Sequence, residues 1–248
     1  MPLENVLQPE ALNRARARHE PVEPLRKYEL PHLIPDNDSA SLELVTARFP
    51  SHPRTEEIRA LRTQLLMRWY APDAGRRVLA IASPGRGDGR TYVTANLAVV
   101  CSQIGLRTLL VDADLRHPRQ HQIFNVSDRK GLAATLAGAP AAEAIGPAPG
   151  FTKLFLLPAG TLPPNAQELL SRTSLAMLLD SLQHEFDLIL IDTPASLDSS
   201  DAQMVTYRAG HAVLLTRRDR TRLSDMSELC SQLRDTGVNV VGTVINDF

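Results

Sequence analysis

A glycine-rich turn in front of a predicted helix is the first feature of this chain that could do chemistry. It reads Ser-Pro-Gly-Arg-Gly-Asp-Gly-Arg-Thr over residues 83–91. Such a turn points several backbone N–H groups at one place, so it predicts a site for an anion such as phosphate. The phosphate-loop pattern G-x-x-x-x-G-K-[ST] matches at Gly89 and Thr91, whereas Pro84 replaces the first glycine and Arg90 replaces the lysine. Taken alone, the segment could also be a glycine-rich surface turn.

Three aspartates at the ends of apolar segments are the second feature. Asp112 and Asp114 follow the apolar residues 108–111, and Asp192 follows residues 188–191. A carboxylate at such a place is costly unless it meets a cation or polar partners. A single aspartate there is often only a helix cap. Three of them beside an anion-binding turn predict a site for Mg²⁺ and a nucleoside triphosphate.

The elements that must position these residues alternate along the chain. The predicted strands cover residues 77–82, 108–112, 153–157, 188–192, 212–215 and 238–244, and the predicted helices cover 53–70, 91–104, 165–185 and 223–236. The strands are continuous apolar runs, which is typical of strands covered on both faces. We therefore predict an α/β fold with a doubly wound, mostly parallel sheet. Ligands bind such sheets beyond the carboxyl ends of the strands, where the glycine-rich turn and the aspartates lie.

The first 50 residues differ in composition from the rest. Eight of the 18 prolines lie within residues 1–53, and no glycine precedes Gly75. We predict a flexible, proline-rich N-terminal arm over residues 1–50 and a nucleotide-binding domain over residues 51–248.

The overall composition excludes several classes of protein. The net charge of −1 argues against binding nucleic acid through bulk electrostatics. No apolar run approaches the roughly 18–20 residues of a membrane span, and no signal peptide is visible. Cys101 and Cys230 fall in apolar-periodic segments and are interpreted as reduced. These features predict a cytoplasmic location.

The chain resembles the bacterial tyrosine kinases of polysaccharide chain-length control, within the MinD/ParA branch of P-loop ATPases. The resemblance rests on the glycine-rich loop, on Asp-Ala-Asp-Leu-Arg at residues 112–116 and on Ile-Asp-Thr-Pro at residues 191–194, and it covers about residues 44–246. The loop is most similar to that of the EpsG-type subgroup found with exopolysaccharide export loci.

This resemblance implies ATP and Mg²⁺ as cofactors and a role for each motif residue. Thr91, Asp114 and Asp192 would hold the metal, and Asp112 would act as base or orient an incoming hydroxyl. Asp112, Asp114 and Arg90 are the implied catalytic residues. The implied nucleotide-binding residues are Gly85, Arg86, Gly87, Asp88, Gly89, Arg90, Thr91, Tyr92 and Asn246. Asn246 could hydrogen-bond adenine, or it could simply end a strand in a turn.

A helix predicted before the sheet carries a second family motif. Glu56, Arg59 and Arg62 fit the pattern E-x-x-R-x-x-R, which the resemblance connects with ring-like self-association. The alternative is an intrahelical Glu–Arg pair on a solvated face, which contributes only a few tenths of a kcal/mol.

Arginine at the lysine position is a departure from the family pattern. Arginine is a planar fork and lysine a point charge, and the two are not interchangeable. We therefore expect nucleotide binding to persist and turnover to be slow or conditional.

The tyrosines also depart from the family pattern, because no C-terminal cluster is present. The four tyrosines of the sequence, Tyr28, Tyr70, Tyr92 and Tyr207, are scattered. Two further groups are interpreted as surface residues: the basic segment 217–222, as a solvated loop rather than a phosphate or subunit contact, and the pair His117 and His121.

The predicted function is that of a cytoplasmic ATP-binding, tyrosine-kinase-like protein of exopolysaccharide chain-length control, polymerisation or export. It would act with a membrane chain-length-determinant partner and lie peripheral to the inner membrane through that partner. The alternatives are a ParA/MinD-like positioning ATPase and a non-catalytic nucleotide-binding scaffold of the same export system.

Overall fold

The computed structural model describes residues 41–247 of the chain. Most of the predicted arm, including Tyr28, lies outside the described residues. Within them, no helix is long and apolar enough to cross a membrane.

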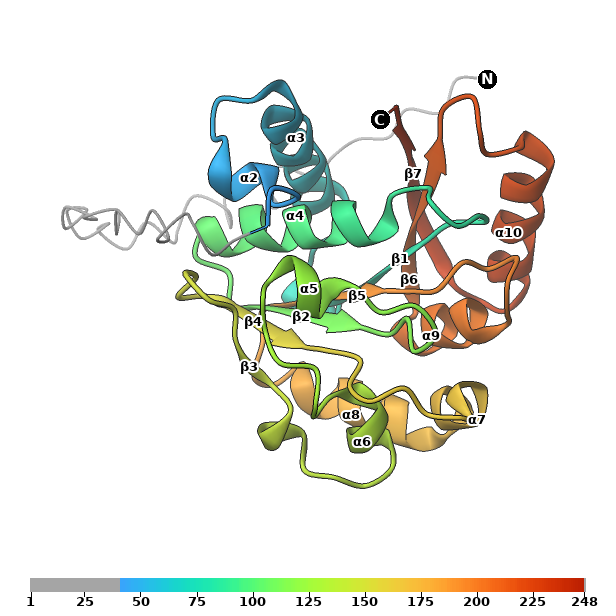
Figure 1. Cartoon of the computed structure of the whole chain (residues 1–248). Helices are drawn as coiled ribbons and strands as arrows, with labels where there is room; N and C mark the ends of the chain where they lie inside the picture. Colours follow the sequence, from blue (N-terminus) through green and yellow to red (C-terminus); the bar gives the residue numbers. More distant parts are fainter. Residues whose placement is uncertain (1–40, 248) are drawn as a thin grey trace, which may run out of the picture. The chain divides into compact units, whose positions relative to one another are not determined.

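A seven-stranded sheet forms the centre of the described chain (Figure 1). Its strands are β1 (Val78–Ala82), β2 (Thr108–Asp112), β3 (Gly146–Pro147), β4 (Leu154–Leu157), β5 (Leu188–Asp192), β6 (His211–Arg217) and β7 (Asn239–Asn246). The strand order is β3-β4-β2-β5-β1-β6-β7, and every pair is parallel except β3 with β4. The predicted doubly wound, mostly parallel sheet is confirmed, and each predicted strand is present within a few residues of its expected ends.

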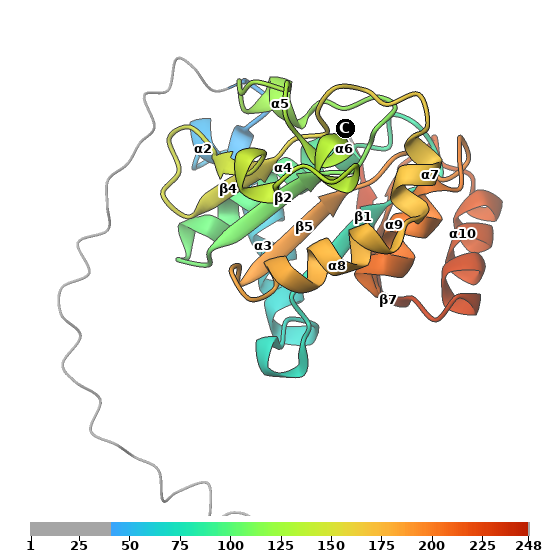
Figure 2. The same ribbon diagram turned by 90° about the horizontal axis from the view of Figure 1, so that it is seen from below.

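Helices cover both faces of this sheet (Figures 1 and 2). They are α2 (Val45–Arg48), α3 (Pro53–Arg68), α4 (Arg90–Gln103), α5 (Gln120–Ile123), α6 (Leu132–Leu136), α7 (Ala166–Ser171), α8 (Thr173–Leu182), α9 (Asp201–Ala209) and α10 (Leu223–Asp235). The α3 and α4 helices pack on one face and α6 to α9 on the other. The α10 helix packs on β6 and the start of β7.

Alternate residues of each central strand belong to the two hydrophobic cores on opposite faces of the sheet. In β1, Leu79 and Ile81 pack with α3 and α4, whereas Val78 and Ala80 pack with the helices of the opposite face. All five residues of β1 are buried. The continuous apolar runs of the sequence are the direct consequence, because both faces of each central strand are covered.

The predicted arm ends earlier than the composition indicates. Residues 45–48 form α2, whose Val45, Thr46 and Ala47 are buried. The amide side chain of Asn96 in α4 fixes this segment: its Oδ1 accepts hydrogen bonds from the backbone N–H (3.0 Å) and hydroxyl (2.8 Å) of Thr46. Its Nδ2 donates to the backbone oxygens of Glu43 and Tyr92.

Two helical regions also differ from expectation. The predicted helix over residues 165–185 is divided into α7 and α8 at Arg172, whose backbone is extended. The α9 helix was not predicted, although its first residues, Asp201 and Ala202, belong to the family pattern.

The loops after β2 and β4 approach each other closely at two glycines. A Cβ atom on Gly131 would lie 2.3 Å from the backbone nitrogen of Gly160 and 2.4 Å from the backbone oxygen of Pro158. The backbone N–H groups of Leu132 and Ala133 donate to the oxygens of Pro158 and Ala159. Only glycine fits at position 131, because any side chain there would meet backbone atoms of residues 158–160.

Candidate active site

The glycine-rich loop connects β1 to the N-terminus of α4, as predicted. Gly87 and Gly89 have φ angles of +78° and +100°, which favour glycine. Gly89 occupies the N-cap position of α4, and no side chain caps the helix. The first-turn N–H groups of a helix have no intrahelical partners, so they offer an anion several donors together with the positive end of the helix dipole.

A cavity of about 200 Å³ lies in front of this loop. Its lining residues are Arg86, Gly87, Gly89, Arg90, Thr91, Tyr92, Asp114, Arg116, His117, Arg119, Pro194, Ala195 and Asp198. Four of these residues are arginines and two are aspartates, so the lining favours a negatively charged ligand. Ligand pockets usually measure about 300–1,000 Å³, so this cavity matches the phosphate end of a nucleotide rather than the whole molecule.

The Arg90 side chain holds the loop itself. Its Nε donates to the backbone oxygen of Thr193 (2.9 Å), and its Nη1 donates to the backbone oxygen of Gly85 (2.7 Å) and to the Ser83 hydroxyl. Within residues 41–247, Nη2 makes no hydrogen bond. The planar fork therefore joins the glycine-rich loop to the loop after β5 and retains one N–H₂ group for the cavity. A lysine could not do both.

Asp114 is the aspartate that faces the cavity. Its Oδ1 accepts hydrogen bonds from the backbone N–H groups of Arg116 (3.2 Å) and His117 (2.9 Å), whereas Oδ2 has no hydrogen-bond partner in the described chain. Thr91, at the start of α4, lines the same cavity. A carboxylate oxygen and a hydroxyl are ligands that Mg²⁺ accepts.

Asp192 lies beneath these two residues. It is buried, its Oδ2 accepts a hydrogen bond of 2.9 Å from the Gln120 side chain, and its Oδ1 has no partner among the described residues. Burial raises the pKa of Asp192 to about 6, although the positive charge of Arg90 and the hydrogen bond from Gln120 oppose the rise.

Asp112 takes a different position from the one expected. Its Oδ1 accepts a hydrogen bond from the backbone N–H of Asp114, and its Oδ2 accepts from those of Arg119 and Gln120. The side chain is fully buried and does not line the cavity. Burial and the negative charge of Asp192 raise the pKa of Asp112 well above its usual value. In this structure the carboxylate holds the turn before α5, and its expected role toward an incoming hydroxyl stays a prediction.

The residues present fit a magnesium ion held jointly with phosphate. The unpartnered Oδ1 of Asp192 and the free Oδ2 of Asp114 are acceptors that a hydrated cation would satisfy. Over residues 41–247, no group of three or more His, Cys, Asp or Glu side chains could hold a metal by itself. The three aspartates therefore do not form a carboxylate cage. This agrees with the usual binding of Mg²⁺ through one or two carboxylates, waters and substrate phosphates.

Three expected nucleotide-binding residues do not line the cavity: Gly85, Asp88 and Asn246. The Asp88 carboxylate accepts a hydrogen bond from the backbone N–H of Gly85 (2.8 Å). The Nδ2 of Asn246 donates to the backbone oxygen of Asp88 (2.8 Å), and its Oδ1 is buried without a partner in the described part. Asn246 is the last residue of β7, as one of its two expected roles required, and it also supports the loop; its contact with adenine stays a prediction.

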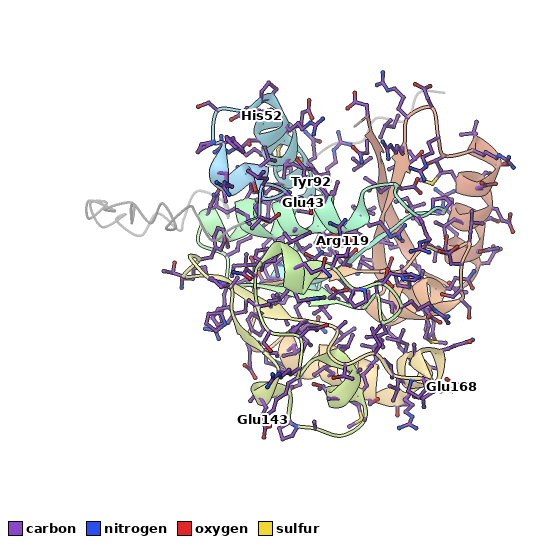
Figure 3. The ribbon with its side chains drawn as sticks, in the orientation of Figure 1. Glu43, His52, Tyr92, Arg119, Glu143 and Glu168 are labelled. Atoms are coloured by element: carbon purple, nitrogen blue, oxygen red, sulfur yellow. The ribbon has the colours of Figure 1, made fainter. Side chains whose placement is uncertain are left out.

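Sequence reasoning missed several residues of the cavity. Arg116 was quoted in the second motif without a role, and here it pairs with Asp201 at 2.7 Å. Arg119 pairs with Glu43 at 2.7 Å (Figure 3) and lines the cavity together with Tyr92. His117, expected to be a surface residue, is exposed but lines the cavity. Their position directly after the second motif was the available signal.

The basic segment 217–222 connects β6 to α10 as predicted, and Asp219, Arg220 and Arg222 are exposed, but two of its residues also contact the glycine-rich loop. The Arg217 guanidinium donates to the backbone oxygen of Gly87 (3.0 Å), and the Thr221 hydroxyl donates to the Asp88 carboxylate (2.9 Å). The loop between β6 and α10 therefore contacts the glycine-rich loop directly.

The motif residues of α3 make contacts within the chain. Glu56 and Arg59 form an i,i+3 ion pair, and Arg59 also donates to the backbone oxygen of Pro50. Arg62 donates to the backbone oxygen of Val100 in α4 (3.0 Å). The intrahelical pair that was the alternative interpretation is present.

Comparisons with known proteins agree with this geometry. A family model described as an AAA domain matches residues 76–218. The putative tyrosine-protein kinase EpsB of Ralstonia solanacearum is 36% identical over 203 residues, which are 82% of this chain and 27% of that protein. The chain thus spans only 27% of the length of this curated relative.

Solved structures give the same result. The kinase domain of the Escherichia coli tyrosine kinase ETK superposes with a TM-score of 0.77 at 30% identity, covering 82% of this chain and 79% of that one. The septum site-determining protein MinD of Pyrococcus horikoshii, solved with Mg-ADP, superposes with a TM-score of 0.61 at 30% identity, covering 68% and 70%.

Proposed function

This chain belongs to the bacterial tyrosine kinases, a branch of the MinD-like P-loop ATPases, and from that premise we propose that it binds Mg-ATP and transfers the terminal phosphoryl group to tyrosine. One observation carries the proposal: a glycine-rich loop that ends with Thr91 at an uncapped helix N-terminus lines one cavity together with Asp114 and four arginines.

Each part of the site has a task in this reaction. The backbone N–H groups of residues 87–91 bind the phosphates, and the free Nη2 of Arg90 adds a positive charge. Thr91 and Asp114 would hold Mg²⁺ directly and Asp192 through water. When bound, Mg²⁺ offsets the phosphate charge as the phosphoryl group moves. Arg86 and Arg116 line the same cavity, where a cation stabilises negative charge that develops on the transferred group.

The biological setting belongs to the proposal as well. We propose that the chain acts in exopolysaccharide chain-length control, polymerisation or export, with a membrane chain-length-determinant protein that holds it at the inner membrane. Support comes from the kinases it resembles, among them a putative tyrosine-protein kinase encoded in a cps region.

Self-association through α3 is a further part of the proposal. Glu56 is largely exposed, and Arg59 is partly exposed, so both remain accessible to a second copy. Light scattering of the wild type and of a double variant, Arg59→Ala with Arg62→Ala, tests this. We expect the wild type to associate and the variant to have a lower mass. A variant with the same mass as the associated wild type would contradict the role of α3.

Phosphorylation with labelled ATP tests the kinase activity. Purified protein is incubated with Mg²⁺, γ-labelled ATP and a peptide from the cytoplasmic end of the partner, and phosphotyrosine is located by mass spectrometry. We expect Thr91→Val to abolish labelling, because it removes the hydroxyl that would bind the metal. Thr243→Val makes the same change at an exposed position of β7 and serves as the matched control. Absence of phosphotyrosine in every condition would contradict kinase activity.

A second candidate is a non-catalytic scaffold that binds nucleotide. The observation that favours it is the commitment of Arg90 to Thr193, Gly85 and Ser83, which leaves less of its charge for the phosphates. Mg-ATP binding without turnover, together with measurable turnover in Arg90→Lys, would favour the scaffold.

A further inference from the structure

The loop between β6 and α10 makes two side-chain contacts with the phosphate loop, more than 125 residues earlier in the sequence. Arg217 donates from Nη1 to the backbone oxygen of Gly87 (3.0 Å), and Thr221 donates from its hydroxyl to Oδ1 of Asp88 (2.9 Å). Arg220 packs so closely that a Cβ atom on Gly87 would lie 3.0 Å from its Nη1. These contacts fix the outer side of the phosphate loop, away from the cavity.

The Asp88 carboxylate is the centre of this arrangement. It is only 2% exposed, and each of its oxygens has a defined partner. Oδ2 accepts from the backbone N–H of Gly85 (2.8 Å), which closes the loop on itself, and Oδ1 accepts from Thr221. The Thr221 hydroxyl accepts in turn from the backbone N–H of Arg217 (2.8 Å). A continuous series of hydrogen bonds thus joins Arg217 to Gly85, and such series strengthen their members.

The last residue of β7, Asn246, makes a third contact with the phosphate loop, through the backbone of Asp88. Asn246 donates from Nδ2 to the backbone oxygen of Asp88 (2.8 Å), and the backbone N–H of Arg218 donates to the backbone oxygen of Asn246 (2.7 Å). Asp88 is therefore held through both its side chain and its backbone by residues from the C-terminal part of the chain.

We propose that Asp88 and Thr221 are positioning residues for phosphate binding, which hold the backbone N–H groups of the phosphate loop in the geometry that a polyphosphate requires. The inference rests on the proposed function, because it assumes that phosphates bind at this loop. Neither side chain lines the cavity in front of the loop. Loss of the Thr221 hydroxyl leaves Oδ1 of a buried carboxylate without its partner, and Asp88 then no longer fixes Gly85 in one place.

Binding measurements with two phosphate probes test the proposal. Calorimetry with Mg-ADP and with magnesium tripolyphosphate is carried out on the full chain and on Thr221→Val. We expect about tenfold weaker binding of both probes, equal to about 1.4 kcal/mol. The shorter conservative variant Thr221→Ser keeps the hydroxyl and is expected to restore affinity to within about twofold of wild type, whereas a purely steric role for Thr221 predicts no such rescue.

Two control variants separate weaker phosphate binding from a general loss of folding. Thr243→Val makes the same chemical change at an exposed residue and is expected to bind both probes like the wild type. Arg217→Met removes only the exposed guanidinium contact to Gly87 and is expected to weaken binding a few-fold with unchanged thermal stability, which keeps the test usable if Thr221→Val folds poorly.

The outcomes distinguish the positioning role of Asp88 and Thr221 from the proposed function. A wild-type protein that binds neither probe contradicts the proposed function. A wild type that binds both, with Thr221→Val and Arg217→Met within twofold of it, overturns the positioning role and leaves the proposed function intact.

Discussion

The side chain of Arg90 joins the first and third sequence motifs: its Nε donates a hydrogen bond of 2.9 Å to the backbone oxygen of Thr193, directly after Asp192. The same guanidinium reaches Gly85 on the other side through Nη1. One side chain thus joins the glycine-rich loop to the strand end that carries the buried aspartate. Lysine carries its three N–H donors on one nitrogen and lacks the planar fork that spans these two oxygens.

Arg90→Lys is expected to destabilise the nucleotide-free protein. Lysine lacks the fork that spans the buried oxygen of Thr193 and the partly buried oxygen of Gly85, so we expect one of them to lose its donor, which costs about 1–3 kcal/mol in the free energy of unfolding. Urea unfolding with and without Mg-ADP measures this. Arg234→Lys, at an exposed position in α10, is the control and should leave the unfolding midpoint unchanged. Equal midpoints for Arg90→Lys and wild type would show that these hydrogen bonds do not stabilise the loop.

Asp192→Asn is expected to change stability in a pH-dependent way. Burial raises the pKa of Asp192 from 3.8 to about 6, so between these values the folded state binds more protons than the unfolded state. The free energy of unfolding therefore falls as pH rises through that window, and the loss is complete above it. Asparagine keeps the acceptor for Gln120 but carries no charge.

Urea unfolding of this variant without Mg²⁺ or nucleotide measures the effect. At pH 7.5 the variant should be more stable than the wild type by roughly 1–3 kcal/mol, and near pH 4 the two should be equal. Its affinity for Mg-ADP at pH 7.5 should be lower, because the charge that attracts the cation is gone. A stability difference that does not vary with pH would contradict the raised pKa.

Gly131→Ala is expected to be strongly destabilising. The new Cβ would lie 2.3 Å from the Gly160 nitrogen, and both neighbours are backbone atoms that cannot rotate away. Overpacking of this kind costs about 1–3 kcal/mol or more. Gly242→Ala is the matched control, because a Cβ there meets nothing within 4 Å and φ is not positive. Differential scanning calorimetry compares the two, and similar melting temperatures would contradict the close approach.

Asn96→Asp is expected to weaken the attachment of α2. The aspartate keeps the acceptor for Thr46 but cannot donate to the backbone oxygens of Glu43 and Tyr92, and it places a charge in a fully buried position. Unpaired buried groups cost about 1–3 kcal/mol each. Asn239→Asp, at an exposed position of β7, is the control in urea unfolding. A wild-type midpoint for Asn96→Asp would show that α2 is held without this amide.

Much of the fold was predictable from hydrophobic patterning. The apolar runs at β2 and β5 gave their limits correctly, and the spacing of Ile58, Leu61 and Leu65 identified α3. The same patterning could not find α2 and α5, which have only four residues each and no room for a helical repeat. It also could not divide α7 from α8, because no glycine or proline marks the extended backbone of Arg172.

The sequence by itself determined that the glycine-rich loop, Asp114 and Asp192 lie at one edge of the sheet, because parallel strands have their carboxyl ends at the same edge. Only the tertiary structure decided what each side chain does there. Asp114 faces the cavity while Asp112 and Asp88 are buried in supporting hydrogen bonds, and Arg90 is turned toward Thr193. The physical reason is that periodicity along a chain encodes which side of an element is buried. The partner of a polar side chain depends on loop conformations that bring together residues as distant as Asp88 and Thr221.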